Sequence, residues 1–512
     1  MKIMVAKTHS MGFFGMEAFP VEVETDLSAG LPAFELVGLP DAAVKESKDR
    51  VRSAIKNCGY QFPVGRITMN LAPADRKKAG PLYDLPLLVS LLTASRQIDC
   101  RTDDAAFLGE LSLSGEVRPV HGVLVMACAA RDAGFSRLFV PEQCSQEAAV
   151  VEGLEVYPVR DVPQLLAHLR GEELISPASP VQTAIDPLPP LDFADVKGQP
   201  EVKRAMEIAA AGGHNILLLG PPGSGKSMLA KRLPSILPEM TFEESLETTK
   251  IYSVAGGLPE GVSLLRERPF RSPHHTTSTT GLTGGGTVPR PGEISLAHNG
   301  VLFLDELPEF PHAALEALRQ PLENGTVEVV RAIGSASFPS RFMLVAAMNP
   351  CPCGYFGHPT RPCTCPPYAV DRYLEKVSGP LLDRMDLHIE VPPVEFDQLS
   401  GSGDGEPSAI IRKRVMAARE LQAERYAGLG FTCNAHIPDS LFENFCHVSE
   451  DGNRLLKRTF EKFGLSGRAY RRVLKVARTI ADLDHSDTIE AAHVGEAVQY
   501  RTLDRKYWQR GI

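Results

Sequence analysis

The spacing of apolar residues predicts a mixed α/β unit at the start of the chain. Phe19–Thr25 alternates apolar and polar residues, as a half-buried strand does, and Arg66–Leu71 has the same strand-like pattern. Asp41–Asn57 follows a turn and has the 3.6-residue period of an amphipathic helix.

The middle of the chain carries short apolar runs that are typical of strands buried on both faces. These runs are Asn215–Leu219, Val301–Leu304 and Phe342–Ala347, and helical stretches separate them. Strands that alternate with helices favour a parallel sheet covered by helices on both faces. The rest of the chain is predicted to be mostly helical, over Ile410–Tyr426, Leu441–Phe445, Asp451–Phe463, Arg468–Leu483 and Thr488–Arg501.

Two polar stretches divide these parts. Ser176–Pro190 carries five prolines in fifteen residues, and Ser400–Pro407 is short and rich in glycine and serine. Proline removes a backbone donor and short Gly/Ser runs are flexible, so both stretches indicate linkers. We expect a first domain at residues 1–172, a linker at 173–190, a core domain at 191–397, a linker at 398–407 and a helical domain at 408–512.

Composition narrows the possible functions. The chain has 512 residues, of which 43% are hydrophobic and 23% charged, as in ordinary globular proteins. The net charge of −9 means that any DNA contact needs a local basic surface. No apolar run approaches the roughly 18–20 residues that cross a bilayer, and Met1–Lys7 lacks the apolar core of a secretory signal. We therefore expect a cytoplasmic protein with no membrane partner.

The clearest chemical pattern is the run Gly220–Ser227 (GPPGSGKS), between a predicted buried strand and a predicted helix at Ser227–Leu237. It matches G-x-x-x-x-G-K-[ST] at every fixed position. Glycines let main-chain N–H groups wrap a phosphate, while the lysine contacts the β- and γ-phosphates and the hydroxyl binds Mg²⁺. This pattern predicts an ATP site.

Two other predicted strands end in polar residues. Asp305 and Glu306 follow Val301–Leu304, and Asn349 follows Phe342–Ala347. Because α/β proteins bind ligands at the carboxyl ends of parallel strands, these residues should meet the phosphate loop. We expect Asp305 to bind Mg²⁺ with Ser227, Glu306 to act as general base, and Asn349 to orient the attacking water. The predicted nucleotide-binding residues are Gly220, Pro221, Pro222, Gly223, Ser224, Gly225, Lys226, Ser227 and Asp305.

Four cysteines crowd into residues 351–365. Cys351 and Cys353 form one C-x-C pair and Cys363 and Cys365 another, with a glycine- and proline-rich loop between them that contains His358. Four thiolates can form a tetrahedral Zn²⁺ shell, and a metal would staple a loop with little core of its own. Four reduced thiols are the alternative interpretation. We interpret the six remaining cysteines as buried small apolar residues: Cys58, Cys100, Cys128, Cys144, Cys433 and Cys446.

These motifs, together with Ser378–Leu387 (SGPLLDRMDL), resemble the AAA+ ATPases of the magnesium-chelatase branch. The chain is more similar still to the bacterial YifB/ComM group of that branch. This closer resemblance is carried by Pro269–His275 (PFRSPHH), Pro289–His298 (PRPGEISLAH), Asn349–Tyr355 (NPCPCGY) and Ala477–Leu483 (ARTIADL). It implies that Arg384 is an arginine finger supplied to a neighbouring subunit and that Arg468 is a sensor arginine of a helical lid. A finger in trans implies a ring, usually a homo-hexamer.

The resemblance also implies loops that touch DNA. The polar insert Arg271–Gly286 has no apolar period, and in relatives an insert here projects into the central channel. A predicted hairpin at Val327–Phe338 has Arg331 near its tip, which suits phosphate contacts. Neither tip carries an aromatic residue, so we predict no base stacking.

The first domain resembles the proteolytic domain of the Lon family at Gly80–Leu85 (GPLYDL) and Gly109–Val120. The positions of that family's nucleophilic serine and activating lysine hold Leu82 and Leu124 here, which disfavours a peptidase. We interpret this domain as a binding or ring-stabilising platform. The basic run Arg76–Lys78 in it is interpreted as a solvated loop rather than as a DNA contact.

The resemblance favours an ATP-driven hexameric DNA motor, similar to the branch-migration helicases of natural transformation. The alternative is a chelatase-type chaperone ATPase that remodels a metal-insertion or other protein partner. A DNA motor predicts DNA-stimulated ATP hydrolysis and salt-sensitive DNA binding.

Overall fold

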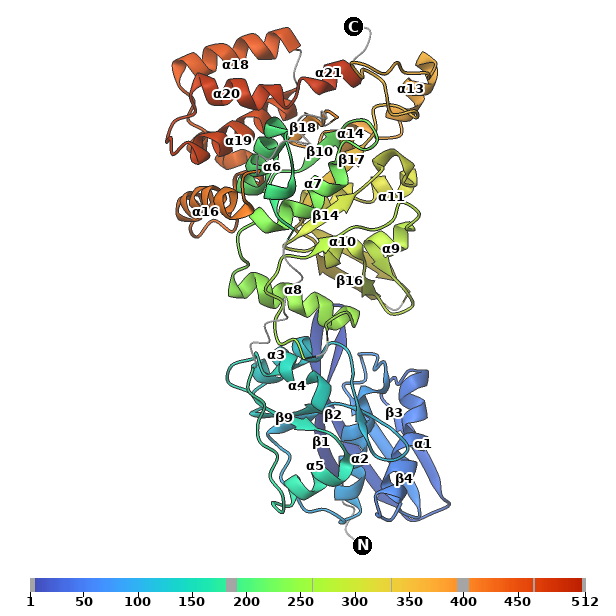
Figure 1. Ribbon diagram of the computed structural model, residues 1–512. Coiled ribbons are helices and arrows are strands. Elements are labelled where there is room, and N and C mark those ends of the chain that lie inside the picture. The colour runs from blue at the N-terminus through green and yellow to red at the C-terminus, as the bar shows by residue number, and fades with distance from the viewer. Residues whose placement is uncertain are drawn as a thin grey trace.

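The structure is a computed structural model, and it describes residues 5–180, 191–259, 261–332, 334–393, 405–463 and 466–508. Figure 1 shows a lower lobe formed by the first part of the chain and an upper lobe formed by the middle and last parts. Most of both predicted linkers, residues 181–190 and 394–404, lies outside the described residues, so the domain boundaries stay predictions.

The lower lobe is a seven-stranded mixed sheet with helices packed on it. Its strands run in the order β3, β4, β2, β1, β5, β8, β9; β1–β2 and β2–β4 are antiparallel and the other pairs are parallel. The strands are β1 Val5–Phe14, β2 Glu17–Ser28, β3 Ala33–Val37, β4 Arg66–Ala72, β5 Ala105–Phe107, β8 Arg137–Pro141 and β9 Glu155–Val159. The helices are α1 Ala42–Asn57, α2 Asp84–Ala94, α3 Val123–Asp132, α4 Ser145–Ala148 and α5 Val162–Leu169. The predicted elements at Phe19–Thr25, Asp41–Asn57 and Arg66–Leu71 are confirmed, and Asp41 caps α1 through a hydrogen bond from the Val44 N–H.

One sequence interpretation holds only in part in this lobe, because Arg76 and Lys77 are exposed whereas Lys78 is not. Lys78 is buried and donates a hydrogen bond to the carbonyl of Pro73, and burial lowers the pKa of its amine. The backbone explains this position, because the Lys78 N–H donates to the Leu39 carbonyl and the Lys78 carbonyl accepts from Asp41 N–H at 2.9 Å. The run Arg76–Lys78 is therefore not simply a solvated loop.

The core of the upper lobe is a five-stranded sheet in which every neighbouring pair is parallel, as the sequence predicts. The strand order is β11 Phe270–Arg271, β14 Val301–Leu304, β17 Met343–Met348, β10 Ile216–Leu219 and β18 Leu387–Glu390. Alternate residues of β10 belong to hydrophobic clusters on opposite faces, so the strand is buried on both sides. The helices around it include α6 Pro200–Gly212, α7 Lys226–Arg232, α8 Phe242–Ala255, α9 Thr279–Thr283, α10 Glu293–Leu296, α11 His312–Glu316, α12 Arg319–Asn324, α13 Pro367–Leu374 and α14 Gly379–Leu382.

The last part of the chain is helical and packs against α6. Its α-helices are α16 Ser408–Arg425, α17 Phe442–Phe445, α18 Glu450–Phe463, α19 Gly467–Leu483, α20 Ala491–Gln499 and α21 Leu503–Tyr507. The predicted helix at Thr488–Arg501 is shorter than expected, because Glu490 is extended and caps α20. No helix in the described ranges is long and apolar enough to cross a membrane.

Within the described residues, the lobes meet in two regions. At one, α3 packs on α8 and the Gly122 N–H donates to the Ser253 carbonyl at 3.0 Å. At the other, the turn between β1 and β2 meets the hairpin formed by β15 Thr326–Arg331 and β16 Gly334–Pro339. There Gly15 lies so close to Ala336 that a Cβ on Gly15 would come within 2.7 Å of the alanine Cβ.

Candidate ATP site

The phosphate loop leaves the carboxyl end of β10 and enters α7. Gly223 and Gly225 have φ angles of +77° and +89°, a region in which other residues are strained. The Lys226 ammonium donates to the carbonyls of Gly220 at 2.8 Å and Pro221 at 2.9 Å, so the loop curls around its own lysine. The buried Ser224 hydroxyl has no hydrogen-bond partner among the described residues, which fits a loop shaped for a further polar ligand.

The ends of the three predicted strands come together at this loop. Lys226 Nζ lies 3.2 Å from Asn349 Oδ1, and Ser227 Oγ lies 2.5 Å from Asp305 Oδ2. Burial lowers the pKa of Lys226 to about 8, although the charges of Asp305 and Glu306 oppose this shift. The predicted convergence of these side chains is present: a hydroxyl and a carboxylate, which are groups that Mg²⁺ prefers, lie in contact, and a lysine and an amide contact each other.

Arg384 and Arg468 lie together, but not at this phosphate loop. Arg384 precedes β18, and its backbone carbonyl accepts a hydrogen bond from Asn215, which precedes β10. Because the strands are parallel, both positions lie at the amino edge of the sheet, opposite the phosphate loop. Burial lowers the pKa of Arg384, with a further contribution from the charges of Arg468 and Arg319.

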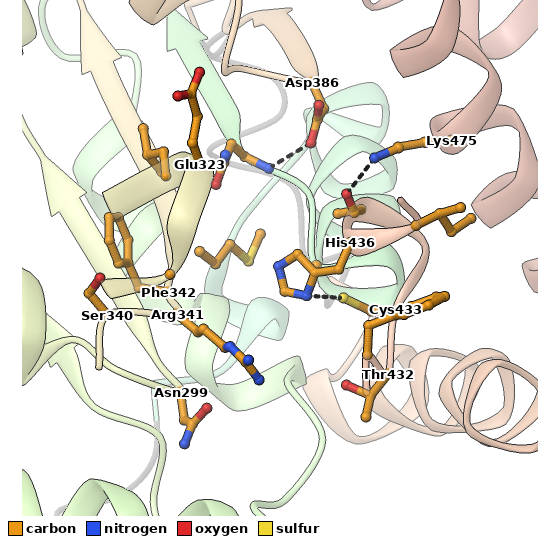
Figure 2. A pocket seen from close by; sticks show the side chains of 18 of the residues that line it. Asn299, Glu323, Ser340, Arg341, Phe342, Asp386, Thr432, Cys433, His436 and Lys475 are labelled. Atoms are coloured by element: carbon orange, nitrogen blue, oxygen red, sulfur yellow. Dashed lines mark hydrogen bonds between the residues drawn. The ribbon is translucent and has the colours of Figure 1, made fainter. Parts of the chain in front are cut away.

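A cavity of about 940 Å³ opens at this amino edge, between the sheet and the helical part, and Arg384 and Arg468 both line it. Figure 2 shows its lining, with Asp386 and Glu323 on the sheet side and Cys433, His436 and Lys475 on the helical side. Arg384 forms an ion pair with Glu323. Other cations in the lining are Arg268, Arg341, Arg419, Arg471, Arg472 and Lys475.

Sequence reasoning missed one pair in this cavity. Cys433 was interpreted as a small apolar residue, and it is buried, but its sulfur lies 3.2 Å from His436 Nδ1 (Figure 2). Burial alone would raise the pKa of Cys433, yet the charges of His436 and Arg419 lower it to about 5. Cys433 is the N-cap and His436 the last residue of a three-residue 3₁₀ helix, Asn434–His436, which is too short to leave a periodic signal in the sequence.

The four clustered cysteines converge at the other edge. Their sulfurs all lie within 4.8 Å of one another, and the separations among Cys351, Cys353 and Cys363 are 3.4, 3.5 and 3.6 Å. Tetrahedral Zn–S bonds of about 2.3 Å place sulfurs about 3.8 Å apart, so this donor set fits a four-thiolate metal shell. The loop also touches the phosphate loop, because a Cβ on Gly354 would come within 2.4 Å of Pro222 Cδ.

The two loops predicted to touch DNA contact each other. The Arg331 guanidinium on the hairpin donates to the carbonyl of Gly286 in the insert at 3.2 Å. The insert also reaches the ATP site, since His275 Nδ1 lies 3.3 Å from Glu306 Oε2. The sequence showed the adjacent histidines of the insert, but it gave no sign that one of them meets the predicted general base.

Leu82 and Leu124, which the Lon resemblance places at that family's nucleophile and base, lie in the hydrophobic core of the lower lobe, where Leu82 is 4% exposed and Leu124 is fully buried. Neither side chain carries a nucleophile or a titratable group. The structure therefore offers no serine–lysine pair at these positions.

Comparison with known proteins gives the family. Family descriptions match in three stretches: "Magnesium chelatase, subunit ChlI" at residues 192–399, "Subunit ChlI of Mg-chelatase" at 23–144 and "Magnesium chelatase, subunit ChlI C-terminal" at 405–501. YifB of Escherichia coli is 45% identical over 501 residues, 97% of each chain, and competence protein ComM of Haemophilus influenzae is 44% identical over 508 residues, 98% of each. The chain belongs to the YifB/ComM family. Lon protease of Mycolicibacterium smegmatis is 27% identical over 156 residues, 28% of this chain and 20% of that one. This YifB/ComM protein thus combines a Lon-like α/β domain, an AAA+ parallel-sheet core and a helical C-terminal region.

Proposed function

We propose that this YifB/ComM protein hydrolyses ATP in a homo-hexameric ring and uses the energy to move DNA, as a branch-migration helicase in recombination and natural transformation. The observation that supports the ATPase is the convergence of Lys226, Ser227, Asp305 and Asn349 at one sheet edge. The DNA role is supported by the similarity to competence protein ComM.

The residues of the phosphate loop have separate functions in hydrolysis. Main-chain N–H groups of Gly223–Gly225 and the Lys226 ammonium bind the phosphates, and Ser227 and Asp305 hold Mg²⁺, which supplies charge neutralisation when bound. Glu306 accepts the proton of the attacking water, and Asn349 orients that water. Adenosine diphosphate and inorganic phosphate are the products.

The position of Arg384 supports a ring. The phosphate loop of the same chain lies at the other end of β10, and this strand of four residues is about 13 Å long. An arginine at the amino edge therefore serves the nucleotide of a neighbouring subunit, with Arg468 beside it. The cavity lining carries acids as well as cations, but an anion that contacts Arg384 and Arg468 relieves the repulsion between these two guanidinium groups, which favours binding of that neighbour's phosphates.

Subunit mixing tests this arrangement. Arg384→Ala and Glu306→Gln should each abolish hydrolysis in pure rings. An equal mixture should regain activity, because about a quarter of randomly formed interfaces pair an intact Glu306 with an intact Arg384. A mixture as inactive as its components would contradict action in trans.

The DNA assignment is tested by ATP turnover with and without single-stranded and branched DNA. We expect stimulation by DNA, loss of stimulation in Arg331→Ala, and DNA binding that weakens as salt rises. Turnover that ignores both DNA forms but rises with a protein or porphyrin partner would instead support the chelatase-type chaperone. The family descriptions name a magnesium-chelatase subunit, and this is the observation that favours the second candidate function.

We also propose that Cys351, Cys353, Cys363 and Cys365 hold one structural Zn²⁺. Metal analysis of the purified protein should find about one zinc per chain, since four thiolates complete a tetrahedral shell. Cys363→Ser should lower the zinc content, whereas Cys128→Ser, which changes a cysteine outside the cluster, should not. A wild-type chain without bound metal would refute this assignment.

A further inference from the structure

A side chain of the central strand holds the backbone of the predicted arginine finger. Asn215 directly precedes β10, which lies between β17 and β18 in the sheet. Its Nδ2 donates to the Arg384 carbonyl at 2.9 Å, and its Oδ1 accepts from the Leu344 N–H at 2.8 Å. Leu344 belongs to β17 and Arg384 precedes β18. The amide therefore ties the turn that carries the finger to the strand on the other side of β10.

The main chain of Asn215 holds the end of the same turn. Its carbonyl accepts from the Asp386 N–H at 2.9 Å and from the Leu387 N–H at 3.1 Å, and its own N–H donates to Asp386 Oδ2 at 3.3 Å. The ring of the buried His214 meets this carboxylate too, with Nδ1 3.2 Å from Oδ2. Figure 2 shows Asp386 on the sheet side of the cavity. Backbone pairing thus fixes the turn at Asp386, and the Asn215 amide extends that hold to Arg384.

The guanidinium of Arg384 has few restraints of its own. Its Nε is buried and has no hydrogen-bond partner among the described residues. The side chain of Glu323, with which it forms an ion pair, is 51% exposed, so water and salt screen that pair. A shift of the Arg384 backbone therefore moves the guanidinium with it, and a misplacement of about 1 Å in a catalytic site can cost about a hundredfold in rate.

We propose that Asn215 is a positioning residue for the arginine finger, because its side-chain amide fixes the backbone from which Arg384 reaches the nucleotide of the neighbouring subunit. This inference rests on the proposed action of Arg384 in trans. The phosphate loop of the same chain lies at the other end of β10, about 13 Å away. A change at Asn215 should therefore lower hydrolysis at the neighbouring site and leave the ATP affinity of its own subunit nearly unchanged.

Asn215→Asp tests the amide with a small change of shape. The carboxylate keeps an oxygen that can accept from the Leu344 N–H, but it has no N–H for the Arg384 carbonyl. In the full-length protein we expect kcat for ATP hydrolysis to fall at least tenfold, while the KM for ATP changes by less than about threefold. Asn453→Asp removes a similar donor on α18, the one to the Val448 carbonyl, and should leave both constants within about twofold.

Subunit mixing distinguishes a positioning role from a structural one. An equal mixture of Asn215→Asp and Glu306→Gln should regain about a quarter of the wild-type rate, because about a quarter of the interfaces then pair an intact acid with an intact finger. A mixture with Arg384→Ala should not exceed the mean of its two components, since neither subunit supplies a well-placed finger. Asn215→Ala, which loses both side-chain bonds, should follow the same pattern. Binding of a non-hydrolysable ATP analogue shows that each variant has folded.

The outcomes separate this inference from the proposed function. Regain with Arg384→Ala but not with Glu306→Gln would place the defect at the ATP site of the variant's own chain and overturn the role of Asn215. Regain in neither mixture, or an unchanged kcat, would overturn it as well. The proposed function fails on a different result, which is a mixture of Arg384→Ala and Glu306→Gln that stays inactive.

Discussion

A single methyl group on Gly354 should disturb ATP hydrolysis through the phosphate loop. Gly354 lies in the cysteine-rich loop with a φ of +83°, and a Cβ there would come within 2.4 Å of Pro222 Cδ. Ordinary contacts between carbon atoms are about 3.5–4.0 Å, so Gly354→Ala requires the loops to separate by about 1 Å. Pro222 lies within the phosphate-binding run, and the displacement therefore reaches the site of chemistry.

The structure supplies a matched control for backbone strain. Gly357 lies in the same loop with a φ of +75°, but a Cβ there would find its nearest neighbour, Lys506 Cε, at 3.7 Å. An alanine at either position pays about 1–2 kcal/mol for its left-handed backbone. Only Gly354→Ala adds the collision with Pro222, so the difference between the two variants isolates the contact between the loops.

A displacement of about 1 Å in a catalytic site can lower turnover by about a hundredfold. We expect kcat/KM for ATP to fall about 10- to 100-fold in Gly354→Ala and less than about threefold in Gly357→Ala. Steady-state hydrolysis measures both, and binding of a fluorescent ATP analogue separates a loss of affinity from a loss of rate. Equal defects in the two variants would refute the argument, because strain alone would then explain them.

Three further predictions follow from buried charges. Because burial lowers the pKa of Lys226 to about 8, ATP binding should weaken up to about tenfold per unit above pH 8 and should take up a proton there, which calorimetry in two buffers measures. Burial raises the pKa of Glu147, on α4 beside α3, to about 7. The contribution of the Glu147 side chain to the free energy of unfolding is therefore complete below about pH 4.5 and is lost as the pH rises through 7. Glu147→Gln should therefore be more stable than wild type by about 3 kcal/mol at pH 8 and equal to it near pH 4.5, as denaturant unfolding at each pH will show, and equal stability at both would contradict the shift. Asp482 is buried between Arg425 and Arg478, and Asp482→Asn should cost about 3–5 kcal/mol because it leaves buried guanidinium charges unpaired, which thermal unfolding tests.

Local patterns explain what the sequence could predict. The bounds of β14 follow from a four-residue apolar run, and the phosphate loop follows from spacings within eight residues. The meeting of Lys226 with Asn349 could also be expected, because parallel strands end at a common edge.

Contacts between distant segments were beyond such patterns. His275 and Glu306 are 31 positions apart, and only the packing of the insert brings them together. Arg419, whose charge helps to lower the pKa of Cys433, lies on the separate helix α16, and Lys78 is buried by backbone bonds to a separate turn. Residue type indicates what chemistry a side chain can do, whereas tertiary packing decides which partner it has.

The Lon-like domain is positioned to influence the ATP site through the hairpin. The β1–β2 turn holds the hairpin at Gly15 and Ala336, the hairpin holds the insert through Arg331, and the insert holds Glu306 through His275. Adjacent contacts do not by themselves show energetic coupling, so the claim needs a measurement.

The variant Ala336→Val provides this measurement. Its larger side chain against Gly15 overpacks the junction of the two lobes, which costs about 1–3 kcal/mol of stability, and it does not touch the nucleotide site. If the contacts act as one unit, this change should alter DNA stimulation of ATP hydrolysis in the wild-type background but not in His275→Ala, in which the last contact is already broken. Equal effects in both backgrounds would show that the Lon-like domain stabilises the hairpin without controlling the acid. The same pair of measurements therefore decides whether a domain with no peptidase residues at Leu82 and Leu124 is a regulator of hydrolysis or only a platform.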